Sequence, residues 1–163
     1  MNTKKLITTA IITAFALVAF VIESAIPPVV PIYGIKLGVA NIFTLFTLYT
    51  LGTKYAAAVL FIRITLGSLL TGQIMSFIYS LSGGLLSFVL MILLKRFFSS
   101  DNLWVLSILC AIAHNVGQLT TAVLVTLTPQ IFYYLPVLIA SAIAAGAVTG
   151  VASQLIIKRI SPK

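Results

Sequence analysis

The chain has 163 residues, of which 61% are hydrophobic and 7% are charged, and its formal net charge is +8. A soluble globular domain has about 25% charged residues, so this composition, with a mean hydropathy of +1.20, excludes one. Six apolar runs of about 16 to 27 residues fill most of the length, and about 20 apolar residues suffice for a helix to cross the hydrocarbon core. We therefore predict an all-α, polytopic membrane protein, because continuous apolar runs lack the alternation of a membrane β-barrel.

Proline, glycine and charged residues divide the apolar runs into six spans of a single transmembrane domain, residues 1–163. The first run ends in Glu23 and a proline-rich segment, without the small-residue cleavage site of a signal peptide, so we expect a retained helix. Glycine, lysine and proline end the later runs. The predicted spans are about 6–26, 37–52, 55–70, 74–94, 103–127 and 131–157.

Lysine and arginine gather on one side of these spans. With the N-terminus inside, eight of the ten basic residues fall in cytoplasmic segments, Lys36 falls in an outer one and Arg63 lies within a span. Because basic residues in short loops stay inside, we predict a multi-pass cell-membrane protein with both termini in the cytoplasm. This orientation accounts for the positive charge, and we expect no nucleic-acid partner. The eight residues are Lys4, Lys5, Lys54, Lys95, Arg96, Lys158, Arg159 and Lys163.

The segment from Pro27 to Asn41 is an outer connector with three prolines and two glycines, and it leads into a short span. That span of 16 residues would rise about 24 Å against a hydrocarbon core of about 30 Å. A short span after a Gly/Pro-rich segment points to a binding site. Lys36 and the free N–H groups at the start of the span could bind an anionic group. The alternative is a rigid turn with a snorkelling lysine.

Arg63 is the strongest single candidate for ligand contact, because it lies among apolar residues in the third span. A buried cation costs at least about 2.5 kcal/mol on insertion scales, so such residues face a cavity or a partner. Two alternatives are an ion pair with Glu23, the acidic residue of the first span, and snorkelling to the interface.

The fifth span contains a polar group, His114, Asn115 and Gln118. The spacing of His114, Gln118 and Thr121 puts three polar side chains on one helical face. They could bind a heterocyclic or carbonyl-rich ligand, or form interhelical hydrogen bonds. The same two alternatives apply to Asn41 and its neighbour Thr44 on the second span.

Small residues recur at a spacing of four in the first span, at Ala10 and Ala14, and in the last, at Ala142, Gly146 and Gly150. Such stripes allow close approach of helices, and for the last span we expect packing within the bundle. Catalytic patterns are lacking: one Asp and one Glu provide neither a carboxylate pair nor an oxygen cage for magnesium. We expect no enzyme, cofactor or metal site.

Three stretches carry a resemblance to a known family: Glu23 with the following prolines, the segment Pro31–Ile42, and His114–Leu119. Together they resemble the Gx transporter family, often labelled heptaprenyl diphosphate synthase component I, over essentially the whole chain. The six spans, the short outer loop and the Ala10/Ala14 pair also resemble the S component of energy-coupling-factor (ECF) vitamin transporters. That resemblance implies a prokaryotic cell, docking of a transmembrane coupling subunit on the two alanines, and two partner ATPases that drive transport.

Our first functional hypothesis is a membrane substrate-binding subunit, S-component-like, that takes up a small anionic or vitamin-like molecule and is powered by partner subunits. Its substrate site would be lined by Lys36, Asn41, Arg63, His114, Asn115 and Gln118. The second is a non-catalytic membrane accessory subunit in quinone, isoprenoid or flavin-dependent electron-transfer metabolism. A third, a membrane prenyl-transfer enzyme, lacks the aspartate-rich motifs that hold magnesium and diphosphate.

Overall fold

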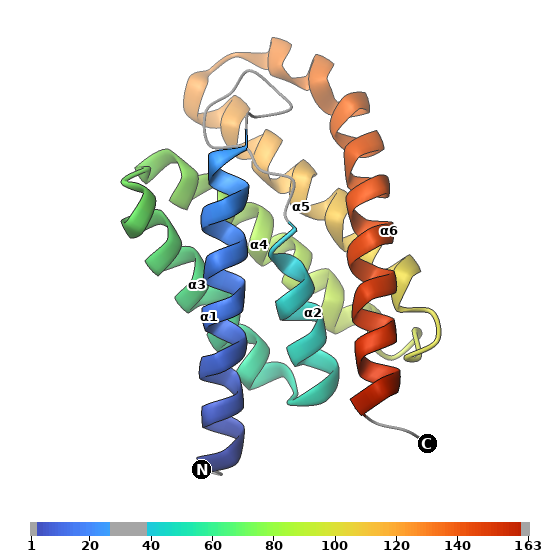
Figure 1. The fold of residues 1–163 in the computed structure, drawn as a ribbon. Coiled ribbons are helices and arrows are strands. Elements are labelled where there is room, and N and C mark those ends of the chain that lie inside the picture. Colours follow the sequence, from blue (N-terminus) through green and yellow to red (C-terminus); the bar gives the residue numbers. More distant parts are fainter. Residues whose placement is uncertain (1–2, 27–38, 161–163) are drawn as a thin grey trace.

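The structure, a computed structural model, describes residues 3–26 and 39–160, and throughout these ranges the regular elements are helices. This confirms the all-α prediction. The elements, shown in Figure 1, are α1 (Thr3–Ala25), α2 (Asn41–Thr50), α3 (Thr53–Thr71), α4 (Ile74–Leu94), α5 (Leu103–Thr126), the 3-10 helix η1 (Pro129–Tyr134) and α6 (Leu135–Ile160).

Within the described ranges, five stretches are long and apolar enough to cross a membrane: α1, α3, α4, α5, and η1 together with α6. The structure thus has the character of a polytopic membrane bundle. The sixth long helix is α2, whose 10 described residues rise about 15 Å. The predicted second span began at residue 37, but residues 37 and 38 lie outside the described residues and the helix begins at Asn41.

Two glycines with positive φ set the ends of α3. Gly52, at φ 100°, separates α2 from α3, and Gly72, at φ 66°, ends α3 in the left-handed conformation with its N–H directed to the Leu69 carbonyl. A side chain is strained at such angles. Proline marks the start of η1 at Pro129, and Pro136 lies in the first turn of α6, where its missing N–H has no intrahelical acceptor to lose.

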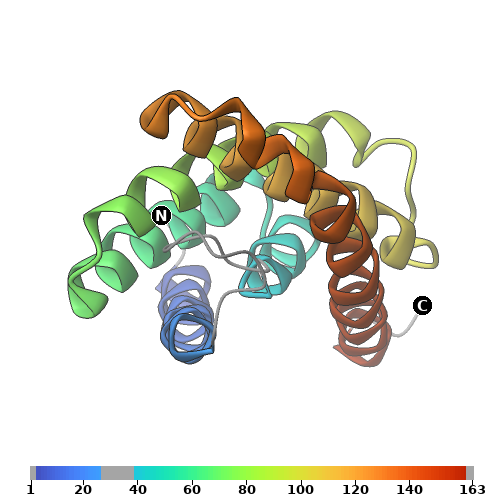
Figure 2. The same cartoon turned by 90° about the horizontal axis from the view of Figure 1, so that it is seen from above.

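The helices form an arc around α2. In the described ranges α3, α4 and α5 pack in succession, α1 packs on α3, and α6 packs on α5. Viewed from above, α1 and α6 are the two ends of the arc and α2 lies inside it, in contact with both (Figure 2). α1 and α6 do not pack directly against each other within these ranges. The arc is therefore open on one side.

Small residues bring the helices of the arc close together. An added Cβ at Gly146 of α6 would lie 2.7 Å from the Ile108 Cα atom, and one at Gly150 would lie 2.5 Å from the Trp104 Cα atom. The expectation that the last span packs within the bundle is confirmed. Gly83 and Gly117 make the equivalent contact between α4 and α5.

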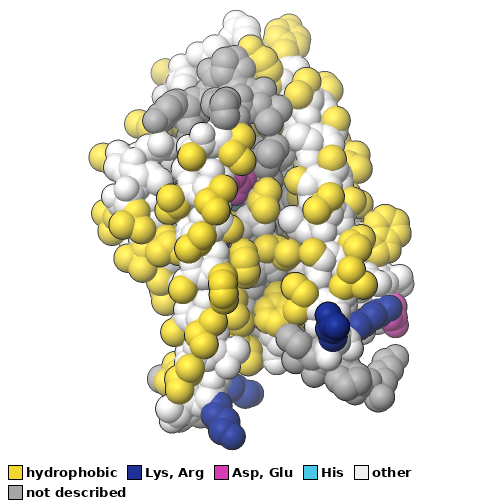
Figure 3. Space-filling view, viewed as in Figure 1, with side chains coloured by type: hydrophobic (Ala, Val, Ile, Leu, Met, Phe, Trp, Pro, Cys, Tyr) yellow, Lys and Arg dark blue, Asp and Glu magenta, His cyan; other side chains and the backbone are white. Residues whose placement is uncertain are grey.

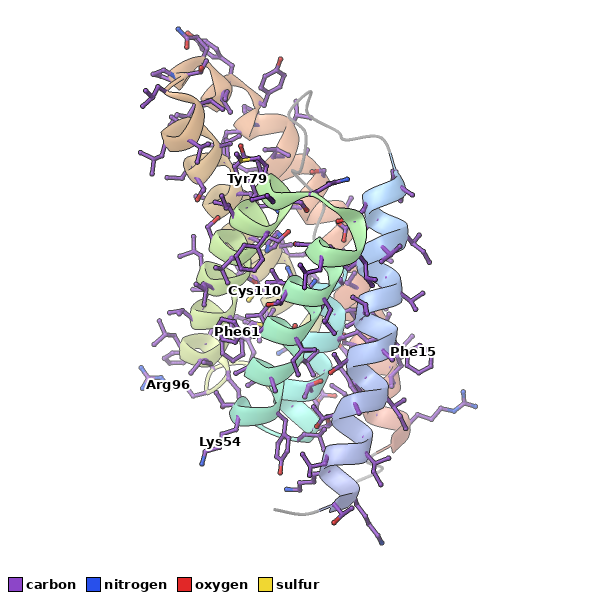
Figure 4. The ribbon with its side chains drawn as sticks, turned by 90° about the vertical axis from the view of Figure 1, so that its left-hand side faces the viewer. Phe15, Lys54, Phe61, Tyr79, Arg96 and Cys110 are labelled. Carbon is purple, nitrogen blue, oxygen red and sulfur yellow. The ribbon has the colours of Figure 1, made fainter. Side chains whose placement is uncertain are left out.

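Apolar side chains fill the inside of the arc and also cover its outside. The largest buried cluster in the described ranges joins α2, α3, α4, α5 and α6 and includes Leu48, Ile64 and Cys110. Phe15 and Phe61 point away from the bundle (Figure 4) and are more than one-third exposed. An outer surface of this kind is solvated by lipid tails.

Basic side chains mark one end of the bundle. The start of α1 and the end of α6 lie there (Figure 1), as do the labelled residues Lys54 and Arg96 (Figure 4). Lys158 at this end forms an ion pair of 2.8 Å with Asp101, although both side chains are about half exposed. Two hydrogen bonds hold the C-terminal end of α2 in place. The Lys95 Nζ donates to the Leu48 carbonyl at 2.8 Å, and the Tyr49 hydroxyl donates to the Phe98 carbonyl at 2.9 Å.

Candidate functional site

Arg63 is buried in the middle of α3 with 2% of its surface exposed. Its Nη2 donates a hydrogen bond of 2.9 Å to the Oδ1 of Asn41, the first residue of α2. The two helices therefore bring together two of the predicted site residues that are separated by 22 positions in the chain. A guanidinium held inside a membrane bundle is costly unless it faces a partner or a cavity.

Glu23 joins α1 to the same region. This carboxylate is 7% exposed, and its Oε1 accepts a hydrogen bond of 3.3 Å from the backbone N–H of Val39. It also interacts electrostatically with Arg63. Between described residues, the guanidinium donates its hydrogen bond to Asn41. The negative charge of Glu23 stabilises the positive charge of Arg63 electrostatically. The carboxylate thus links the end of α1 to the start of α2 and balances part of the buried positive charge.

His114 and Gln118 reach this region from α5, and both are buried, at 3% and 0% exposure. Both pack against Gly83 of α4: an added Cβ there would lie 3.1 Å from the His114 Nδ1 and 2.7 Å from the Gln118 Cγ. His114 is also close enough to Arg63 to interact with it electrostatically. The spacing of four residues predicted that His114 and Gln118 share one face of the helix. In the structure both contact α4.

Glycines at the α4–α5 contact were not among the predicted site residues. An added Cβ at Gly83 would lie 2.6 Å from the His114 carbonyl oxygen, and one at Gly117 would lie 2.9 Å from the Gly83 Cα atom. Any side chain at either position would push α5, and with it His114, away from α4. The sequence feature that could have predicted this contact is the Gly83-Gly84 pair in the fourth span, since glycine is frequent where membrane helices approach closely.

The cluster formed by Glu23, Asn41, Arg63, His114 and Gln118 holds unused hydrogen-bond donors. Within the part of the chain that the structure describes, the Arg63 Nε and the Asn41 Nδ2 are buried atoms with no hydrogen-bond partner. Buried polar groups are nearly always hydrogen-bonded, and each unmet one carries a desolvation cost. Both atoms are donors. The cluster is therefore suited to a ligand that presents oxygen or nitrogen acceptors, including an anionic one.

The structure does not bring Asn115 into this cluster. Its side chain is fully buried, and its Nδ2 donates to the Leu138 carbonyl of α6 at 2.9 Å. Consecutive residues on an α-helix point about 100° apart, so His114 faces α4 while Asn115 faces α6. Thr44 lies one turn after Asn41 on α2 and is also buried.

Of the three remaining predicted residues, the structure describes two. Lys36, like the connector from Pro27 to residue 38, lies outside the described residues. Ala10 and Ala14 are exposed on α1, where their small side chains leave a flat strip on the lipid-facing surface.

Comparison with known proteins gives one match. The family model described as heptaprenyl diphosphate synthase component I matches residues 12–156, which is most of the chain. Neither a curated protein nor a solved structure matches significantly.

Proposed function

We propose that this chain, which belongs to the heptaprenyl diphosphate synthase component I family, is the solute-binding subunit of a membrane transporter. The observation that carries the proposal is the buried Arg63 inside a membrane bundle, hydrogen-bonded to Asn41 and with its Nε unpaired among the described residues. Ionisable residues inside membrane helices face the bundle interior or a water-filled cavity and mark substrate and ion pathways.

The chemistry of the cluster supports a small solute rich in acceptor atoms, anionic or carboxylate-bearing. Arg63 and Asn41 offer donors, and a guanidinium is suited to planar recognition of carboxylate or phosphate oxygens. Glu23 offsets part of the positive charge, so a monoanion or a zwitterion fits better than a polyanion. Gln118 and His114 would contact the remaining polar groups of the solute. We also assign Lys36 and the connector before α2 to the outer entrance of this site.

Energy for uptake would come from partner proteins. The chain has no phosphate-binding loop: Gly52-Thr53-Lys54-Tyr55 lacks both the upstream glycine and the Ser or Thr after the lysine. The exposed Ala10 and Ala14 on α1 would admit a helix of a transmembrane coupling subunit at close range, as in ECF transporters. We place both termini in the cytoplasm of a prokaryotic cell, because the basic residues lie at the end of the bundle where the termini lie.

A role in isoprenoid or quinone metabolism is the alternative, and the family's description favours it. We assign this chain no prenyl-transfer chemistry of its own, since such reactions hold diphosphate through magnesium ions bound by several carboxylates. One Asp and one Glu cannot supply such a site. The alternative is thus a non-catalytic accessory subunit that holds a lipid or a partner.

Ligand carried through gentle purification tests the proposal. Native mass spectrometry of the whole protein should show a bound small polar molecule that the Arg63→Met variant lacks. Arg96→Met is the matched control, because it removes an exposed arginine at the basic end of the bundle and should retain the molecule. A quinone or polyprenyl lipid in place of a polar molecule would support the accessory role instead, and equal occupancy in both variants would refute the assignment of Arg63.

A further inference from the structure

An apolar groove occupies the open side of the arc, between α1 and α6, with α2 as its floor. It has a volume of about 300 Å³. A water occupies about 30 Å³ in the liquid and a methylene is of similar size, so the groove has room for roughly ten such groups. Its walls include Ile11, Phe15, Phe43, Phe46, Ser153 and Ile156.

Exposed basic residues stand at one end of this groove, on both walls. Lys4 lies on the same stripe of α1 as Ile11 and Phe15, at spacings of seven and eleven. Arg159 follows Ile156 by one turn of α6. Figure 3 faces the open side of the arc and shows hydrophobic side chains along both walls, with Lys and Arg side chains on either side of the lower end. A hydrocarbon-lined groove therefore ends at two cations.

One polar atom lies within the apolar wall. Ser153 is fully buried, and its Oγ has no hydrogen-bond partner in the described structure. It lies six residues before Arg159, about 9 Å along the helix. The Oγ exposes no surface to the groove, so the lining that the groove offers to a ligand is apolar, as an acyl chain requires.

We propose that the groove binds one acyl chain of an anionic phospholipid whose headgroup lies between Lys4 and Arg159. The walls belong to membrane-crossing helices, so lipid rather than water surrounds the groove, and basic pockets between membrane helices favour anionic headgroups. The site is separate from Ala10 and Ala14, which lie about 100° around α1 from the Ile11–Phe15 stripe. It is equally independent of the proposed solute site, since neither Arg63 nor His114 lines it.

Lipid titration of the whole protein in detergent, followed by native mass spectrometry, tests the headgroup contacts. Phosphatidylglycerol should bind at least tenfold more tightly than phosphatidylcholine with the same acyl chains. Each basic residue near the surface is worth about fivefold in affinity, so Lys4→Gln with Arg159→Gln should weaken phosphatidylglycerol binding about 25-fold. Lys54→Gln with Arg96→Gln makes the same charge change at the same end, away from the groove, and should have little effect.

Two tryptophan variants of α6 test the acyl-chain contact. Ile156→Trp fills the groove and should abolish binding of both lipids, whereas Leu155→Trp, on a lipid-facing position of the same helix, should not. Both variants should keep the melting temperature of the parent protein. Equal affinity for the two lipids, equal losses in the two charge variants, or binding that survives Ile156→Trp would each overturn the proposal. A dimer that Ile156→Trp disrupts would do so too, because a second copy would then occupy the groove.

Discussion

Replacing Arg63 separates a ligand-binding role from a purely structural one. In the ligand-free protein, Arg63→Met removes a cation that is 2% exposed and one hydrogen bond of 2.9 Å to Asn41. A hydrogen bond to a charged group is worth about 1.5–3 kcal/mol, but removal of the cation also relieves its desolvation cost. These two effects oppose each other, and we expect the free energy of unfolding to change by less than about 2 kcal/mol.

Ligand affinity should respond much more strongly. Loss of one partner of a buried charged contact costs about 2–5 kcal/mol, which corresponds to a dissociation constant about 30-fold to several thousand-fold higher. The assay is calorimetric titration with the molecule identified by mass spectrometry, alongside thermal unfolding of the same samples.

The variant pair Glu23→Gln and Arg63→Met completes the test. If Arg63 serves mainly as a structural partner of Glu23, either single change leaves a buried unbalanced charge and lowers stability by about 3–5 kcal/mol, and the double variant recovers both stability and binding. If Arg63 contacts the ligand, the double variant folds and does not bind. Binding that survives Arg63→Met with its affinity unchanged would refute the reasoning.

Three further predictions concern topology, packing and assembly. In a Cys110→Ala background, a cysteine introduced in the 128–134 segment should react with an impermeant reagent added outside, and one near Lys95 should not; the reverse pattern would contradict the proposed orientation. Gly83→Ala should lower the free energy of unfolding by about 1–3 kcal/mol, because its Cβ would lie 2.6 Å from the His114 carbonyl oxygen, whereas Gly84→Ala, which meets only the ends of leucine and isoleucine side chains, should cost less in the same denaturation assay. Ala14→Trp should leave solute affinity unchanged and abolish co-purification with a coupling subunit, and intact assembly would place docking elsewhere.

Helix boundaries were predictable where charge or glycine interrupts an apolar run. The predicted span 74–94 coincides with α4, since Gly72 ends the preceding helix and Lys95 follows the apolar run. The start of the helix in the second span was not predictable, because apolar composition alone does not distinguish helix from other backbone. Val39 and Ala40 are apolar, yet the helix begins only at Asn41.

The candidate site was predictable in its residue types and only partly in its geometry. A charge inside an apolar run identified Arg63, but its contact with Asn41 depends on how α2 is seated inside the arc. His114 and Asn115 are neighbours in sequence and face different helices, because the rotation of α5 is set by the glycine contact with α4. Sequence periodicity gives the relative directions of side chains on a helix, and it does not give the absolute orientation of that helix.

The order of the cluster residues along the chain has a consequence for biosynthesis. A nascent chain that has emerged only as far as Thr71 already contains Glu23 and Asn41, the residues that balance and hydrogen-bond Arg63. The insertion machinery therefore receives the helix that contains Arg63 after the residues that contact it. Inserting a central arginine costs at least about 2.5 kcal/mol, and contacts within the first three helices can offset this free energy. Release of α3 into the bilayer need not wait for α5, and a chain truncated after α3 should insert with Arg63 in the membrane.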